Sequence, residues 1–195
     1  MSKNLISKED IMPMSEYIKI RKERRSAMTD IKRDRRVNCG PDATFYFENY
    51  ATMWHQIHEM LYIEKGGDAQ ITDELTAYNP LIPDGSELVA TLMFEIDDPV
   101  RRAQVLGGLG GVEETIAIEF DDCVIQGCPE SDVDRTSTAG KASSVQFIHF
   151  PFSKAQVNKF KEKNSQPKIR IGHAEYAYSA KFSEQVHSNL IGDLD

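Results

Sequence analysis

Apolar and polar residues alternate between Leu88 and Ile96 in the way that predicts a β-strand. One face of this strand would carry Leu88, Ala90, Leu92, Phe94 and Ile96. The preceding segment, Asn79-Pro80-Leu81-Ile82-Pro83-Asp84-Gly85, is typical of a helix end followed by a tight turn, because each proline restricts the backbone and the glycine tolerates positive φ. We therefore predict a strand over residues 88–96, with Leu92 and Phe94 buried.

The first 80 residues show helical periodicity instead. Apolar side chains recur every three or four positions from about Ser15 to Asp34, and again from the capping residue Asn49 to about Lys65. A third, shorter helix is expected from about residue 68 to 78. Residues 37–48 favour a short hairpin, because a run of strand-forming residues follows Gly40-Pro41.

Strand patterns dominate the second half of the chain. They cover residues 115–126 as a hairpin, then 144–152, 168–171 and 176–182. Two further helices are expected to begin at Asp98-Pro99 and at the capping box Ser153–Gln156, and the acidic segment after Val186 is expected to be frayed. Helices followed by strands favour an α+β fold: one domain over 1–195, with N-terminal helices (1–80) packed on a mainly antiparallel β-sheet (86–184).

Charge is distributed unevenly along the chain. The net charge is −8, yet the segment from Lys19 to Arg36 holds nine basic and three acidic residues, which gives it a local charge of +6 and leaves −14 elsewhere. A basic helix can bind an acidic or redox protein partner, dock on the acidic part of its own chain, or face solvent. No base-stacking aromatic residues are interleaved with these charges, which argues against nucleic acid as the partner.

The apolar content of 40% is ordinary for a globular protein, and no apolar run approaches the roughly 20 residues that span a bilayer. The first residues lack the apolar core of a signal peptide, so we expect a cytoplasmic location and no membrane association. Three cysteines fit a reducing compartment, and Cys39, Cys123 and Cys128 would form a thiolate metal site only if the fold brought Cys39 to the other two. Self-association into a homo-oligomer stays open.

The second predicted helix carries the residues that are best suited to bind a metal. His55, His58 and Glu59 lie on one helix face, and Glu48 precedes the helix; imidazole and carboxylate ligands of this kind bind zinc or iron. The pattern matches neither the His-Glu-x-x-His order of zinc proteases nor the paired Glu-x-x-His motifs of di-iron bundles. The alternative interpretation is a solvated helix face or a subunit contact.

Basic residues provide a second candidate site. Arg135 and Lys141 flank a polar loop and, together with Arg35 and Arg36, can bind an anion if the fold brings the two pairs together. The sequence contains no Gly-x-Ser-x-Gly nucleophile elbow, Walker motif or Rossmann fingerprint. Whether the protein is an enzyme is therefore left open.

Several blocks of the chain resemble the bacterial domain-of-unknown-function 3501 family. They are Arg35-Arg36-Val37, Gly40-Pro41, Phe47-Glu48-Asn49, the stretch from Ala77 to Gly85, Ser144-Val145 with Phe147, and His173-Ala174-Glu175-Tyr176. The resemblance adds His173 and Tyr176 as candidate site residues. It also implies a link to rubrerythrin-like and iron–sulfur proteins, and hence an accessory or interaction protein in redox or metal pathways. The alternative is a metal-binding protein or metal-dependent enzyme that uses His55, His58 and Glu59.

Overall fold

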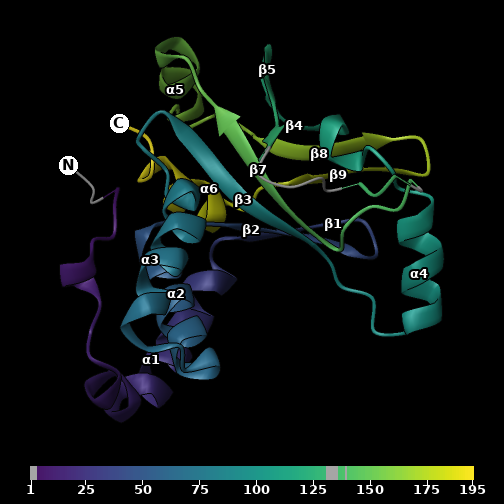
Figure 1. Ribbon diagram of the computed structural model, residues 1–195. Helices are drawn as coiled ribbons and strands as arrows, with labels where there is room; N and C mark the ends of the chain where they lie inside the picture. Colours follow the sequence, from purple (N-terminus) through teal and green to yellow (C-terminus); the bar gives the residue numbers. More distant parts are fainter. Residues whose placement is uncertain (1–3, 131–135, 139) are drawn as a thin grey trace.

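The computed structural model describes residues 4–130, 136–138 and 140–195, which form two antiparallel sheets with flanking helices (Figure 1). The helices are α1 (Met14–Arg33), α2 (Tyr50–Glu64), α3 (Gly67–Tyr78), α4 (Pro99–Gly107), α5 (Lys154–Phe160) and α6 (Glu184–Ile191), with 3-10 turns η1 (Lys8–Asp10), η2 (Asn79–Leu81) and η3 (Val112–Thr115). The strands are β1 (Arg36–Cys39), β2 (Ala43–Phe47), β3 (Glu87–Phe94), β4 (Ile116–Phe120), β5 (Cys123–Gln126), β6 (Cys128–Pro129), β7 (Val145–Pro151), β8 (Lys168–His173) and β9 (Tyr176–Lys181).

The strands are divided between two sheets. The first sheet has the order β1-β2-β3-β7-β6 and the second has the order β5-β4-β8-β9, and every named pairing is antiparallel. The α+β class and the antiparallel pairing are as predicted. The alternation of side chains could not show that the β4–β5 and β8–β9 hairpins pair with each other and form a sheet of their own.

The main core lies between the two sheets. The alternating residues of β3 contribute Leu88, Ala90 and Leu92, and those of β4 and β8 contribute Ile116, Ile118 and Ile169, all fully buried. Leu92 and Phe94 are buried as predicted. This core explains why β3 alternates so regularly along its length.

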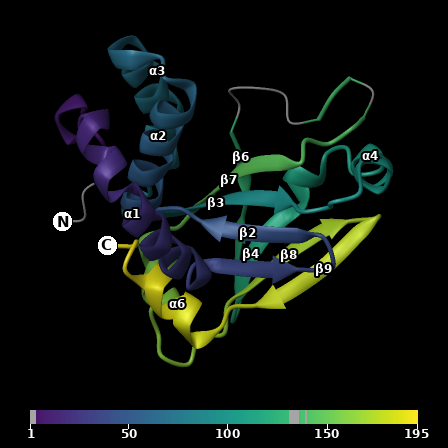
Figure 2. The same ribbon diagram turned by 90° about the horizontal axis from the view of Figure 1, so that it is seen from below.

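The helices α1, α2 and α3 lie together at one end of the first sheet, and α2 packs against part of its outer face (Figure 2). Met53, Ile57 and Leu61 of α2 pack with Val89 of β3 and Phe147 of β7. Both faces of β3 are therefore shielded over its central residues. None of the helices in the described ranges combines the length and the apolar character needed to cross a membrane.

The predicted helix starts are confirmed in detail. Asn49 accepts a hydrogen bond from the Thr52 amide at 3.0 Å, and Asp98 accepts one from the Arg101 amide at 2.6 Å. Ser153 begins α5 through the expected capping box with Gln156. These side chains satisfy amide groups that have no partner within the first helical turn.

The expectation of a frayed segment after Val186 is wrong. Ser183 caps α6, and Val186, Leu190 and Leu194 of this segment are buried in the main core. Val186 and Leu190 are four positions apart on one face of α6, and Leu194 continues the buried contact beyond the end of the helix. Burial of these side chains orders the segment.

Candidate functional site

Glu48 lies at the junction between β2 and α2, and backbone contacts hold it firmly. Its amide donates to the carbonyl oxygen of Val89 at 2.8 Å, and its own carbonyl accepts from the guanidinium of Arg35 at 3.1 Å. The next residue, Asn49, caps α2. The side chain of Glu48 therefore extends from a fixed point on the outer face of the first sheet.

The carboxyl group of Glu48 is only partly satisfied. The residue is 4% exposed, and its Oε1 atom accepts a hydrogen bond from the hydroxyl of Thr91 on β3 at 2.7 Å. Its Oε2 atom is buried and has no hydrogen-bond partner among the described residues. Buried acceptors without a partner are rare in folded proteins, and each one calls for an explanation.

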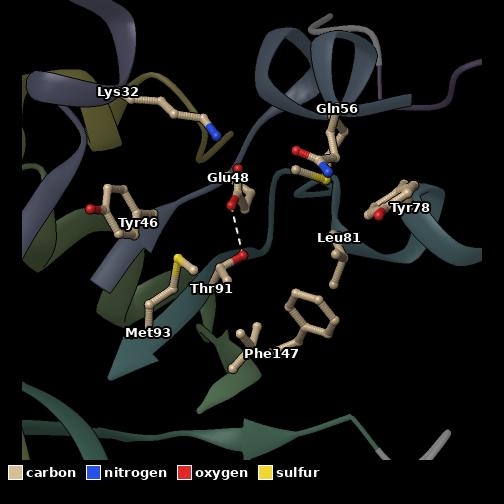
Figure 3. A pocket seen from close by; sticks show the side chains of 11 residues that line it. Lys32, Tyr46, Glu48, Gln56, Tyr78, Leu81, Thr91, Met93 and Phe147 are labelled. Atoms are coloured by element: carbon tan, nitrogen blue, oxygen red, sulfur yellow. Dashed lines mark hydrogen bonds between the residues drawn. The ribbon is translucent and has the colours of Figure 1, made fainter. Parts of the chain in front are cut away.

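Glu48 faces a cavity of about 440 Å³ between the first sheet and the helices (Figure 3). We call this cavity the Glu48 pocket. Its apolar lining residues are Met53, Leu81, Met93, Val145 and Phe147, and its other lining residues are Lys32, Tyr46, Glu48, Gln56, Tyr78 and Thr91. A volume of this size and an apolar wall with a few polar groups are typical of small-molecule sites.

Lys32 brings a positive charge to the same pocket from α1. In Figure 3 its amine is directed toward the side of the cavity on which Glu48 lies. The ion pairs within the described part of the chain do not include one between Lys32 and Glu48. The two opposite charges therefore border one cavity without neutralising each other directly.

The predicted metal ligand His58 is fully buried and already has a partner on each ring nitrogen. Nδ1 donates to the carbonyl oxygen of Trp54 at 2.7 Å, and Nε2 accepts from the amide of Met12 at 3.0 Å. Burial lowers the pKa of His58, and the two contacts define the neutral tautomer protonated on Nδ1. These bonds account for His58 as a structural link between α2 and the N-terminal segment.

His55 and Glu59 join a hydrogen-bond network with α1. Arg21 donates to both carboxylate oxygens of Glu59, at 2.9 and 2.8 Å, and the hydroxyl of Tyr17 donates to Glu59 at 2.8 Å. Nδ1 of His55 lies 3.2 Å from the same hydroxyl. Burial favours a raised pKa for Glu59, but the hydrogen bonds from Arg21 and Tyr17 together with the positive charge of Arg21 outweigh it, so the pKa is lowered. Burial lowers the pKa of His55.

The four residues predicted to bind zinc or iron are thus distributed over two environments. His55, His58 and Glu59 belong to the contacts between α1 and α2, whereas Glu48 lines its own pocket. In the ranges that the structure describes, no group of three or more His, Cys, Asp or Glu side chains is arranged to hold a metal. Metal binding stays a prediction, and the contacts of these residues are explained without it.

Anion binding by Arg35, Arg36, Arg135 and Lys141 stays a prediction, and Arg35 already has partners within the fold. Arg35 is buried and binds the carbonyl oxygens of Phe47 and Glu48 and the carboxylate of Asp193. Arg36 begins β1, and Lys141 precedes Ala142, whose amide donates to the carbonyl oxygen of Leu106 near the end of α4. Arg135 lies outside the described residues.

His173 and Tyr176 have structural partners. The amide of Glu175 donates to Nδ1 of His173 at 3.2 Å, and Nε2 lies 3.3 Å from the carbonyl oxygen of Gly110. The hydroxyl of Tyr176 accepts from the amides of Asp42 and Ala43, both at 2.9 Å, and donates to the carbonyl oxygen of Cys39 at 3.0 Å. Tyr176 therefore ties β9 of the second sheet to the β1–β2 turn of the first.

The three cysteines lie apart. Cys39 is in β1 and Cys128 is in β6, which are the two edge strands of the first sheet, and Cys123 is in β5 at the edge of the second. Burial raises the pKa of the Cys39 thiol to about 11. Four strand spacings of about 4.8 Å separate β1 from β6, so Cys39 and Cys128 cannot share a metal ion.

The imidazole of His149, on β7 of the first sheet, lies between two carboxylates. Its Nδ1 lies 2.9 Å from a carboxylate oxygen of Glu87, its Nε2 lies 3.6 Å from Glu130, and the hydrogen bond with Glu87 raises its pKa. A raised pKa in the folded state means that protonation stabilises the fold at low pH and that this contribution is lost as pH rises through the folded-state value.

We therefore expect His149→Gln to lower the free energy of unfolding more at about pH 6 than at about pH 9, because the ordinary histidine pKa is about 6.5. Urea unfolding of both proteins at the two pH values measures the difference. An equal loss at both values would show that His149 contributes only as a neutral side chain.

Sequence reasoning selected Glu48 but missed most of its surroundings. Thr91 and Met93 reach the pocket because β2 pairs with β3 in a register that puts Tyr46 opposite Thr91. The alternation of β3 places Thr91 and Met93 on the strand face opposite the main core, and this pattern in the sequence could have predicted that they line a site outside the core. Glu48, Tyr78, Leu81, Val145 and Phe147 also belong to the blocks on which the family resemblance rests, so those blocks meet around one cavity.

The fold and the pocket define a class of protein: an α+β fold of two antiparallel sheets, with N-terminal helices that enclose a cavity of small-molecule size on the outer face of the first sheet. The chain belongs to the family described as protein of unknown function (DUF3501), which matches residues 5–194. The resemblance seen in the sequence is therefore confirmed.

A solved relative shares the whole fold. The crystal structure of a novel protein of unknown function from Burkholderia pseudomallei K96243 is 34% identical to this chain and superimposes with a TM-score of 0.90. The similarity covers 97% of this chain and 99% of the relative. None of the curated proteins matches the chain. The accessory role in redox or metal pathways stays a prediction.

Proposed function

We propose that the protein binds a small molecule in the Glu48 pocket and that the ligand donates a hydrogen bond from a protonated amine to Glu48. The observation that carries the proposal is the buried Oε2 atom of Glu48, which has no partner in the described part of the chain. The backbone around Glu48 is fixed by bonds to Val89 and Arg35, so the carboxyl group is held ready for a ligand.

The energetic argument concerns the cost of an unsatisfied acceptor. A buried polar atom without a partner costs about 1–3 kcal/mol, and more if the group is charged. The hydroxyl of Thr91 satisfies Oε1 and leaves Oε2 buried without a partner in the described residues. An ammonium group would supply both a donor and the opposite charge, which makes a charge-assisted hydrogen bond to the carboxylate.

The walls of the pocket indicate the rest of the ligand. Met93 and Phe147 lie on the sheet side, and Met53 and Leu81 lie on the helix side. Contact with an apolar ligand body would remove their exposed surface from water, at about 25 cal/mol per Å². The favoured ligand is therefore an amine with an apolar body.

Replacement of Glu48 by glutamine tests this proposal. Phenethylamine is expected to bind the wild-type protein, and Glu48→Gln is expected to weaken binding by about tenfold or more, because a charge-assisted hydrogen bond contributes about 1.5–3 kcal/mol. Isothermal titration calorimetry measures both affinities, with 2-phenylethanol as the uncharged probe of the same shape.

Glu23→Gln is the matched control, because Glu23 is an exposed carboxylate of α1 that does not line the pocket. This variant should bind phenethylamine as the wild type does. The proposal fails if phenethylamine shows no measurable binding, if 2-phenylethanol binds equally well, or if Glu48→Gln leaves the affinity unchanged.

A further inference from the structure

The Glu48 pocket is also lined by the positively charged Lys32, which takes no part in the proposed contact between the ligand amine and Glu48. Lys32 lines the same cavity as Glu48, and its amine is directed into that space (Figure 3). Neighbouring acids of α1 are engaged elsewhere, since Asp30 and Asp34 both pair with Arg33. Within the described ranges, Lys32 has no carboxylate at ion-pair distance.

The arrangement matches a ligand that carries both signs of charge. A simple amine would neutralise Glu48 but would bring a second positive charge toward Lys32, which is unfavourable in a partly enclosed cavity where charge interactions are stronger than in water. A ligand carboxylate would pair with the Lys32 amine and remove that repulsion.

We infer that the ligand is an aminocarboxylate with an apolar body, of which an apolar amino acid is the simplest example. This inference rests on the proposed function. The ammonium group binds Oε2 of Glu48, the carboxylate binds the amine of Lys32, and the apolar body packs between Met93 and Phe147 on one side and the α2 residue Met53 on the other. Both charged groups of the protein are then neutralised by a single molecule.

The test compares probes that share a phenyl ring and differ in charge. The probes are phenethylamine, 3-phenylpropionate and a set of α-, β- and γ-aminocarboxylates bearing a phenyl group, so that the separation of the two charges is varied. At least one aminocarboxylate is expected to bind about tenfold more tightly than phenethylamine in calorimetric titrations, because the added ion pair is charge-assisted and partly buried.

Lys32→Gln should remove this advantage and improve the affinity for phenethylamine, because the repulsion between the two positive charges is then removed. Lys32→Arg should retain the advantage, because it keeps the positive charge. Lys22→Gln is the matched control, since Lys22 is an exposed lysine of the same helix that does not line the pocket. Thermal unfolding of each variant checks that the fold is intact.

The outcomes separate the two proposals. If phenethylamine binds in a Glu48-dependent way but no aminocarboxylate binds more tightly, the inference about the ligand is overturned and the proposed function stands. The same holds if the advantage persists in Lys32→Gln. If phenethylamine shows no measurable binding, the proposed function itself is wrong.

Discussion

Replacing Arg35 with methionine is expected to lower the free energy of unfolding by about 3–5 kcal/mol, the usual loss when one partner of a buried ion pair is removed. The residue is only 5% exposed, and its guanidinium binds two carbonyl oxygens and the carboxylate of Asp193. Burial raises the pKa of Asp193, and Arg35 offsets part of that rise. Without Arg35, Asp193 would be a buried carboxylate with no counter-charge.

Urea unfolding monitored by circular dichroism measures this loss. Arg33→Met is the control, because Arg33 is exposed and its pairs with Asp30 and Asp34 lie at the surface, where such a change costs about 1 kcal/mol or less. The double variant Arg35→Met with Asp193→Asn is expected to regain part of the loss, since it removes the unpaired charge. A loss for Arg35→Met no larger than for Arg33→Met would contradict the assignment.

Replacing Tyr176 with phenylalanine is expected to lower the free energy of unfolding by about 3 kcal/mol, although only one oxygen atom is removed. That hydroxyl satisfies the amides of Asp42 and Ala43 and the carbonyl oxygen of Cys39. All three groups would be left unsatisfied in a buried region, at about 1 kcal/mol or more each. The ring stays in place, so no cavity contributes to the loss.

Hydrogen exchange gives this prediction a local measurement. The amides of Asp42 and Ala43 should lose protection in Tyr176→Phe beyond the general decrease in stability. Tyr178→Phe is the control, because the Tyr178 side chain is exposed and its hydroxyl makes none of the described hydrogen bonds. Equal effects of the two substitutions on stability would show that the three backbone bonds contribute little.

The sequence predicted most of the elements but not their assembly. The alternation in β3 predicted its buried face, and Asn49, Asp98 and Ser153 marked helix starts correctly. The division into two sheets depends on which hairpins pair across long separations, which local alternation does not encode. The helix α6 and its burial were not predicted, because so short a segment shows only one four-residue spacing of buried apolar side chains, from Val186 to Leu190.

The candidate site was predicted in part for a similar reason. His55, His58 and Glu59 were correctly placed on one helix face, but their partners Met12, Tyr17 and Arg21 come from segments 38 or more positions away. The contacts with these partners join α2 to α1 and to the N-terminal segment, and they occupy the side chains that the sequence suggested as metal ligands. Glu48 was selected as a carboxylate near α2, whereas its relation to Thr91 follows from strand register and its relation to Lys32 from the packing of α1.

The contact between Arg35 and Asp193 also constrains the order of events during synthesis. The two residues are 158 positions apart, so the guanidinium that supports the backbone of Glu48 meets its carboxylate only after Asp193 has left the ribosome. Until then Arg35 has no carboxylate of Asp193 to pair with, and the side chains of α6 do not yet cover the main core. Pairings between such distant residues slow folding, and a chain that still lacks Asp193 and α6 exposes apolar surface that favours association.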